Sequence, residues 1–115
     1  DQGVSADKDT TERKVEFHLK KRIREAGGRF RKAHWVARRG APDDLVWWPS
    51  PNPVRHPQPV AAFVEVKRPG KLPTAQQANE HRLLRRDGWE VWIVDSFDAV
   101  ESFVLHMLAR HAEAL

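Results

Sequence analysis

Two short stretches of this chain carry residue types that could do chemistry together. Asp43 follows a turn that begins at Gly40, and an apolar run from residue 63 to residue 67 (FVEVK) holds Glu65 and Lys67. Side chains alternate faces along a β-strand, so Glu65 and Lys67 point the same way. Charged groups on an otherwise apolar strand are costly to bury without partners. With Asp43 beside them, these groups could bind a divalent metal and position a water, which predicts metal-dependent phosphodiester hydrolysis.

Each motif also has a plainer interpretation. Gly, Pro and Asp are ordinary turn residues, so Asp43 and Asp44 could simply form a turn. Glu65 and Lys67 could form a solvent-facing ion pair on an edge strand. The order of the motifs favours the catalytic interpretation, because a turn acid, an apolar strand, a long loop and a second strand ending in Glu-x-Lys seldom occur together by chance. Asp44 either joins the metal site or faces solvent.

Composition limits the class of protein. The chain has 115 residues, no cysteine, a net charge of +4 and a pI near 9.9. These values predict one globular domain over residues 1–115, with residues 1–9 as a disordered tail. The absence of cysteine excludes disulfides and thiolate zinc sites, and fits a reducing compartment such as the cytoplasm. Basic residues gather between Lys8 and Arg39, which favours a polyanionic partner.

Periodicity and breaker residues predict seven elements. The expected helices and strands, in chain order, are a helix from Thr10 or Thr11 to Ala26, strands at 29–37, 45–48 and 60–67, a helix at 74–86, a strand at 89–94 and a helix after Ser96. Pro49 to Pro59 holds five prolines and reads as a stiff loop. The middle helix is long enough to connect parallel strands. The order α-β-β-β-α-β-α predicts an α/β fold with a mixed sheet flanked by helices.

Aromatic and histidine side chains give weaker signals. Trp47, Trp89 and Trp92 lie in strand patterns and are expected in the core, whereas Trp35 and Trp48 are candidates for DNA or dimer contact. The six histidines show no zinc-like spacing and are expected at the surface. In the 74–86 helix, the apolar positions are Ala75, Ala78 and Leu84.

Taken in series, the motifs resemble the virus-type replication-repair nuclease (VRR-NUC) domain, a branch of the PD-(D/E)xK nuclease superfamily. The resemblance runs from Thr11 to about Phe103, and it looks most like the stand-alone phage and bacterial members. The matching stretches are residues 12–16, 27–28, 31–32, 39–43 and 63–71, Gln77, Gly88 and residues 94–96. The resemblance implies a restriction-endonuclease-like core and an Mg²⁺- or Mn²⁺-dependent nuclease in the cytoplasm of a bacterium or of a phage-infected cell.

The resemblance also assigns roles by position. Asp43 and Glu65 resemble the metal-binding acids, with the carbonyl of Val66 as a further ligand and Lys67 as the catalytic lysine. Glu16 resembles the helical acid that reaches the metal, although Glu12 one turn earlier could exchange roles with it. The helix-opening glutamine corresponds to Gln77, or to Gln76 if the loop shifts by one residue. The basic side chains expected near DNA are Lys32, Arg38, Arg39, Arg68 and Lys71.

Three functions follow from these observations. The leading one is a metal-dependent DNA endonuclease, and the resemblance to the stand-alone members implies that it cuts branched DNA, such as a four-way (Holliday) junction, as a homodimer. One small site cannot cut two strands symmetrically, and a two-fold dimer suits a two-fold junction. The alternatives are a non-catalytic nucleic-acid-binding module and a nuclease subunit that a partner protein targets. The proline loop is expected to be an inert insertion, with DNA or a second subunit as its other possible contacts.

Overall fold

The computed structural model describes residues 11–115, so the predicted disordered tail at residues 1–9 lies outside the described residues. Seven elements follow one another in the predicted order: α2 (Glu12–Glu25), β1 (Arg29–Lys32), β2 (Asp44–Trp48), β3 (Val60–Val66), α3 (Ala75–Arg86), β4 (Val91–Val94) and α4 (Phe97–Glu113). The prediction of a mixed α/β fold is therefore confirmed. None of the helices in the described part of the chain is long and apolar enough to cross a membrane.

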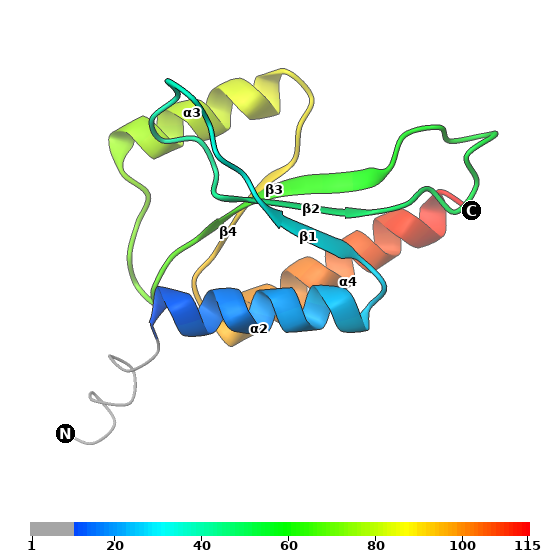
Figure 1. The fold of residues 1–115 in the computed structure, drawn as a ribbon, viewed down its shortest axis with the longest axis horizontal. Coiled ribbons are helices and arrows are strands. Elements are labelled where there is room, and N and C mark those ends of the chain that lie inside the picture. Colours follow the sequence, from blue (N-terminus) through cyan, green and yellow to red (C-terminus); the bar gives the residue numbers. More distant parts are fainter. Residues whose placement is uncertain (1–10) are drawn as a thin grey trace.

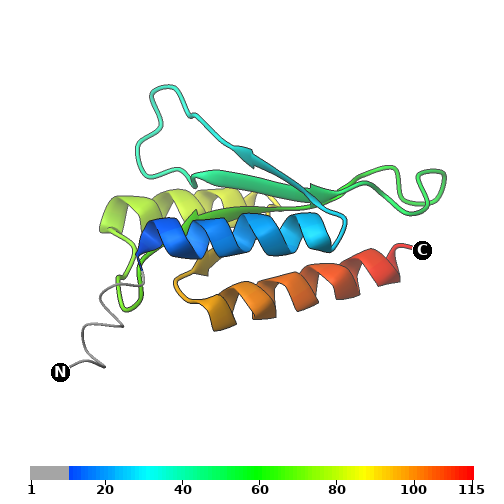
Figure 2. The ribbon, with the colours of Figure 1, turned by 60° about the horizontal axis from the view of Figure 1, so that its bottom comes forward.

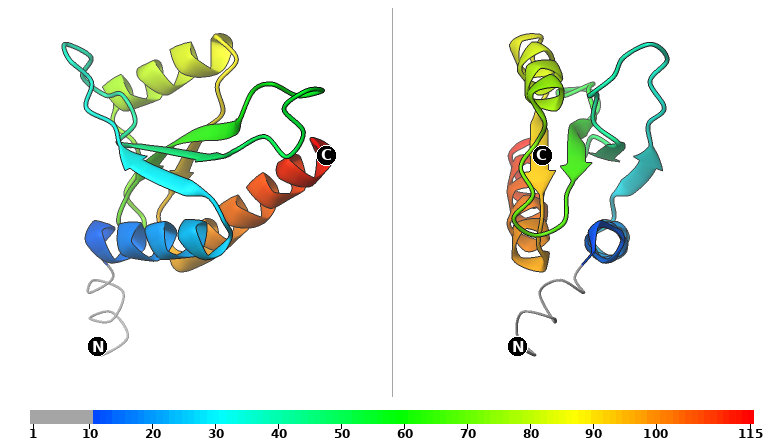
Figure 3. Two further views of the ribbon diagram at one scale, coloured as in Figure 1. Left: turned by 45° about the vertical axis from the view of Figure 1, so that its right-hand side comes forward. Right: turned by 90° about the vertical axis from the view of Figure 1, so that its left-hand side faces the viewer.

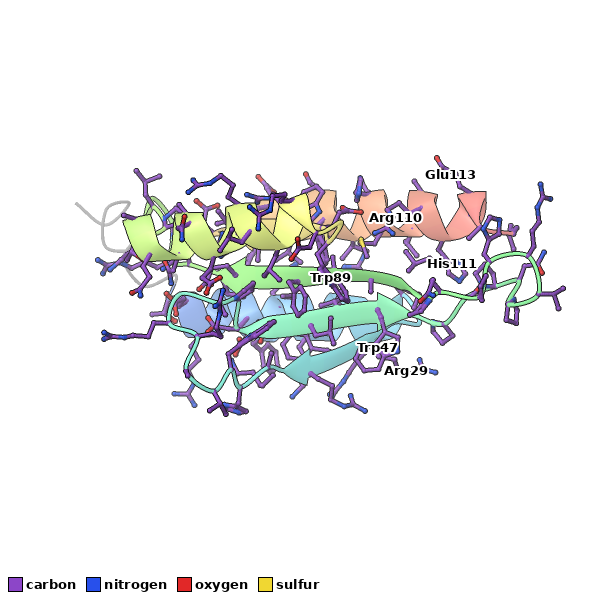
Figure 4. All side chains as sticks on the ribbon, turned by 90° about the horizontal axis from the view of Figure 1, so that it is seen from above. Arg29, Trp47, Trp89, Arg110, His111 and Glu113 are labelled. Carbon is purple, nitrogen blue, oxygen red and sulfur yellow. The ribbon has the colours of Figure 1, made fainter. Side chains whose placement is uncertain are left out.

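The four strands form one sheet in the order β1-β2-β3-β4. The first two pairings are antiparallel, and β3 pairs with β4 in parallel through the α3 crossover. Arg29 and Trp47 are paired across β1 and β2 and lie close together in Figure 4. Asp44, at the start of β2, is paired with Val64, near the end of β3. This register brings the Pro-Asp turn to the Glu65–Lys67 end of β3.

Two amphipathic helices build the core on one side of the sheet. Thr11 caps α2 by accepting a hydrogen bond from the Lys14 N–H, and this helix buries Val15, Leu19 and Ile23. Ser96 caps α4 in the same way, with Phe103 among its buried residues. Figures 1 and 2 show α2 and α4 running beside each other along this face, and the two helices are in contact. This packing fixes the position of the first turn of α2 relative to the sheet.

The opposite face of the sheet is covered by α3, whose buried positions are not its apolar ones. Ala75 and Ala78 are exposed, whereas Glu80 and His81 are buried. The side of α3 that faces the sheet is therefore polar, although the helix begins and ends as predicted. Thr74 and Gln77 form a capping box at its start, in which each side chain bonds to the backbone of the other.

A loop from Ala33 to Asp43 replaces the second half of the first predicted strand, since β1 ends at Lys32. Gly40 has a φ of +86°, and a Cβ there would lie 2.8 Å from the carbonyl oxygen of Gln76. The loop therefore packs directly against the first turn of α3. Only a glycine allows this approach, and it brings Asp43 toward the helix that carries Gln77. The views in Figure 3 show this loop and α3 at the same end of the molecule.

The proline loop lies at the other end of β2 and β3, because it joins the end of β2 to the start of β3. This places it away from the acids, and it lines a cavity together with Arg110 near the end of α4. The predicted role of Trp48 as an exposed contact residue is wrong: its side chain is only 2% exposed, and its indole N–H donates to the carbonyl of Ala26. Trp89 is 43% exposed rather than core, and it packs on Phe63.

Candidate active site

Glu65 and Lys67 occupy the α3 side of the central sheet, while Val64 and Val66 join the core on the other side. Glu65 is 2% exposed and Lys67 is 5% exposed. Their strand lies between β2 and β4, so the interpretation as a solvent-facing ion pair on an edge strand is wrong. Burying these two charged groups in the middle of a sheet costs free energy unless each finds a partner of opposite charge or a hydrogen-bond partner.

Two side chains of α3 contact the Glu65 carboxylate. The Gln77 amide donates to Glu65 Oε2 at 3.3 Å, and His81 Nε2 lies 3.5 Å from Glu65 Oε1. The second distance is long for a hydrogen bond, and Oε1 is buried without a hydrogen-bond partner in the described structure. Burial, with the added negative charge of Asp43, raises the pKa of Glu65. Of the two candidate glutamines, Gln77 contacts the acid, and the Gln76 side chain is exposed.

Asp43 connects the α3 side of the site to the start of α2. Its charge acts on Glu65, and its side chain lines a cavity of about 270 Å³. The other residues that line this cavity are Glu12, Arg13, Glu16, Lys32 and Val66. Three of the four predicted metal ligands, Asp43, Glu16 and Val66, therefore share one cavity, and Glu65 lies next to Asp43. Both Glu12 and Glu16 reach this cavity, so the alternative between them stays open.

Glu16, Lys32 and Asp44 form a charged group at the side of the cavity. Lys32 Nζ lies 2.6 Å from Glu16 Oε2 and 3.5 Å from Asp44 Oδ1. Partial burial by itself would raise the pKa of Glu16, but the hydrogen bond from Lys32 and the neighbouring Asp44 carboxyl outweigh it and lower that pKa. Burial and the nearby Glu16 carboxylate raise the pKa of Asp44 to about 8. Asp44 is fully buried, which excludes the solvent-facing alternative.

The donor set suits a hard divalent cation, although the ligand assignments remain predictions. Oε1 of Glu65 is buried without a hydrogen-bond partner in the structure of residues 11–115, and Asp43 lies beside this carboxylate. Mg²⁺ and Mn²⁺ prefer such oxygen ligands, and a cation would offset the repulsion between Asp43 and Glu65. Within the same residues, no three His, Asp or Glu side chains stand close enough together to hold a metal as they are.

The predicted DNA-contacting cations differ in their surroundings. Lys32 lines the cavity. Arg38 forms a salt bridge with Glu80 at 2.8 Å, which links the 33–43 loop to α3. Arg39, Arg68 and Lys71 are exposed in the loops around the site. These three are thus available to phosphate, whereas Lys32 and Arg38 already contact a carboxylate.

Sequence reasoning missed His81. It was expected at the surface, but its side chain is fully buried and both ring nitrogens lack a hydrogen-bond partner in the described structure. A signal existed, because His81 follows Gln77 by four residues and such residues share one face of a helix. Once Gln77 was expected to face the site, His81 belonged on the same face.

Comparisons with known proteins bear on the family to which the chain belongs. No family model matches the chain. It is 38% identical over 84 residues to a protein of Acyrthosiphon pisum secondary endosymbiont phage 1 named "Putative nuclease p44". The aligned residues cover 73% of this chain and 82% of that protein. A solved structure described as a VRR_NUC domain superposes with a TM-score of 0.69 at 35% identity, covering 84% of this chain and 97% of the other.

Proposed function

The chain belongs to the VRR-NUC family of nucleases, and from this premise we propose that it is a divalent-metal-dependent endonuclease that hydrolyses phosphodiester bonds in DNA. One observation carries the proposal. The Glu65 carboxylate is buried beside Asp43 with one oxygen lacking a hydrogen-bond partner in the described structure, on the same strand face as Lys67. Two adjacent carboxylates in a partly enclosed site are stabilised by a cation between them.

The proposed ligands of Mg²⁺ or Mn²⁺ are the carboxylates of Asp43 and Glu65, the carbonyl of Val66, and Glu16 directly or through water. When bound, such an ion supplies positive charge to a phosphate oxygen and lowers the pKa of a coordinated water. Glu65 is suited to this work because α3 restrains its carboxylate at both oxygens, with the Gln77 amide at Oε2 and His81 near Oε1.

Lys67 and Gln77 are proposed to act around these ligands. Lys67 would hold the attacking water or stabilise the extra negative charge that develops on the phosphate, because an ammonium on the Glu65 face is within reach of the same substrate group. Gln77 would orient Glu65, since its amide donates to Oε2 while its carbonyl accepts from the Thr74 N–H. Outer contacts of this kind typically tune a metal site by 10- to 100-fold.

The substrate and assembly complete the proposal. We propose branched DNA, including four-way junctions, as the preferred substrate, and a homodimer as the acting form. The single candidate site found in residues 11–115 supports this, because two symmetric cuts need two sites. The exposed Arg39, Arg68 and Lys71 would contact phosphates on either side of the cut strand.

The test is cleavage of labelled single-stranded, duplex, flap and four-way-junction DNA in Mg²⁺, Mn²⁺ or EDTA. Wild type is compared with Lys67→Ala, and with Arg86→Ala as an exposed cation on the far end of α3. We expect metal-dependent cutting that is fastest on the junction, lost in Lys67→Ala and unchanged in Arg86→Ala.

Two other results would contradict the proposal in different ways. Cutting that persists in EDTA would refute the metal dependence. No cutting of any substrate, together with tight binding in EDTA, would leave a nucleic-acid-binding module on a nuclease fold. Light scattering of the protein with and without junction DNA tests the dimer separately, and a strictly monomeric complex would overturn it.

A further inference from the structure

The outer side of α2 carries a band of cations around one exposed aromatic ring. We call it the α2 basic face, and it consists of Arg13, Lys14, Phe17, Lys20, Lys21 and Arg24. These residues lie opposite the buried positions of the helix, as their helical spacing requires. The Phe17 side chain is 72% exposed, so the core does not explain it. An aromatic ring left in solvent among cations is typical of a binding surface.

The α2 basic face lines a shallow hollow of about 640 Å³ between α2 and the start of α4. Phe17, Phe97 and His18 supply its aromatic lining, and the His18 and Phe97 rings lie 4.6 Å apart. Arg13, Lys14 and Lys21 supply its charge, and no acidic side chain of the described residues lines it. Figure 2 shows α2 and the start of α4 side by side.

Two acids near this face, Glu25 and Glu101, are already bound by other side chains. Glu25 lines a second hollow beside Phe17, but Arg22 holds its carboxylate at 2.9 Å. Glu101 on α4 accepts hydrogen bonds from Arg22 and contacts His18 at 2.9 Å. The exposed cations of the α2 basic face are therefore not neutralised by these carboxylates. A ligand that carries both flat rings and repeated negative charge matches this surface.

The α2 basic face is continuous with the candidate active site. Arg13 lines the hollow beside Phe17 and also the cavity that holds Asp43 and Glu16. We propose that unpaired nucleotides of the DNA substrate bind along the α2 basic face, with one base stacked on Phe17 and the backbone on Arg13, Lys14 and Lys21. This inference rests on the proposed function, because it takes DNA as the substrate.

Two considerations favour unpaired DNA over other occupants. A base can offer its face to a phenyl ring only when it is not stacked in a duplex, and such stacking binds single strands without regard to sequence. A second copy of this chain fits less well, because a two-fold contact around Phe17 would bring Arg13, Lys14 and Lys21 against the same residues of the partner. Like charges brought together in this way oppose association.

The test is fluorescence anisotropy of a labelled oligothymidylate and of a duplex of equal length, both in EDTA so that no cutting is needed. Phe17→Ala should weaken oligothymidylate binding about tenfold, which is the expected size for one lost stacked base, and should leave duplex binding unchanged. Phe17→Trp should retain the binding. Leu105→Ala is the matched control, because Leu105 on α4 is 68% exposed and lies outside this face.

The cations are tested through salt dependence. Lys14→Ala and Lys21→Ala should each make the negative slope of log affinity against log salt less steep, by about 0.7 for the single strand. Equal loss of single-strand and duplex binding in Phe17→Ala, or no loss in either, would overturn the inference. A dimer that Phe17→Ala converts to a monomer, with oligothymidylate binding intact, would assign the face to a second copy instead. Cleavage that fails in wild type while these binding effects remain would refute only the proposed function.

Discussion

Among single residues, Asp44 and Glu65 are the two carboxyl groups that the fold buries most completely at the site. They lie on opposite faces of the sheet, with Asp44 toward Glu16 and Lys32 and Glu65 toward Gln77 and His81. Burial raises the pKa of both groups. Each therefore holds its proton more tightly in the folded protein than in the unfolded chain, and this gives folding stability a definite dependence on pH.

The sign of that dependence can be worked out for the metal-free protein. Between the ordinary pKa of Asp44, 3.8, and its folded value of about 8, the folded state binds more protons than the unfolded state. Stability therefore falls as pH rises through this window, by at most about 1.4 kcal/mol per pH unit for one group. Glu65 adds in the same direction. The lowered pKa of Glu16 acts below its ordinary value of 4.5, so it does not cancel the slope above pH 5.

We therefore expect Asp44→Asn to flatten the fall in stability between pH 5 and pH 8. The amide cannot ionise, so the contribution of this residue disappears while that of Glu65 remains. Urea denaturation in EDTA at pH 5, 6, 7 and 8 measures the effect on wild type and variant. Parallel curves for the two proteins would show that Asp44 does not titrate as burial requires.

Gln77 offers a second prediction for a single residue, because its amide both caps α3 and donates to Glu65. Gln77→Leu should cost about 1 kcal/mol of stability, as the loss of a capping partner does, and should slow cleavage by about 10- to 100-fold. Gln76→Leu is the matched control, since its side chain is exposed on the same turn, and should change stability by less than about 0.5 kcal/mol. Similar losses in both variants, seen in denaturation and cleavage rates, would remove Gln77 from the site.

Most elements could be predicted from the sequence, because helix caps and hydrophobic periodicity are local signals. The caps Thr11, Thr74 and Ser96 all begin helices as such residues should. The buried side of α3 could not be predicted in this way. It faces the sheet with Glu80 and His81, and a polar buried face gives no hydrophobic period to detect. This side of α3 is buried because it contacts Glu65 on β3, which lies earlier in the chain.

The length of β1 was also not predictable, since tertiary packing ends it. Residues 33–37 alternate well enough for a strand, but the chain leaves the sheet at Lys32 so that Gly40 can pack on the first turn of α3. For the site itself, the motifs at Asp43, Glu65 and Lys67 were sufficient to predict that β2 and β3 bring them together. The burial of Asp44 and His81 could not be predicted from the sequence, because it depends on how the helices pack against the sheet.

Gly40 should therefore be the glycine least tolerant of substitution near the site. In Gly40→Ala the new Cβ would meet the backbone of Gln76 and Gln77 at 2.8 to 3.0 Å, in addition to the strain of a positive φ. We expect a loss of about 2 to 3 kcal/mol and weaker cleavage, because the loop carries Asp43. Gly88→Ala is the control: its φ is +100° but nothing lies within 4 Å, so only about 1 kcal/mol should be lost. Equal losses of unfolding free energy would contradict the close packing.

Across the whole molecule, the candidate active site lies at one end of the sheet and the proline loop at the other. The proline loop and the end of α4 lie at the far end of β2 and β3, while the acids, Lys67 and the first turn of α2 share the other. The view along α2 in the right panel of Figure 3 shows α2 and α3 on either side of the strands that carry the acids. A substrate strand that follows the α2 basic face would thus pass the acid cavity at Arg13.

Metal binding should also be visible in the stability of the whole fold. A cation that binds only the folded protein stabilises it, and it binds better when the carboxyl groups have lost their protons. We therefore expect Mn²⁺ to raise the melting temperature of the wild type more at pH 8 than at pH 6, in contrast to the falling stability of the metal-free protein. Differential scanning fluorimetry measures both series, and an increase that is the same at the two pH values would contradict this coupling.

The central claim is that Asp43 and Glu65 bind a divalent cation in a nuclease site. Isothermal titration of Mn²⁺ into wild type, Glu65→Gln, Asp43→Asn and Lys67→Ala tests it without any nucleic acid. We predict saturable binding by wild type and Lys67→Ala, and a loss of at least about tenfold in affinity in Glu65→Gln and Asp43→Asn. Binding of equal strength in all four proteins, or none in folded wild type, would contradict the account.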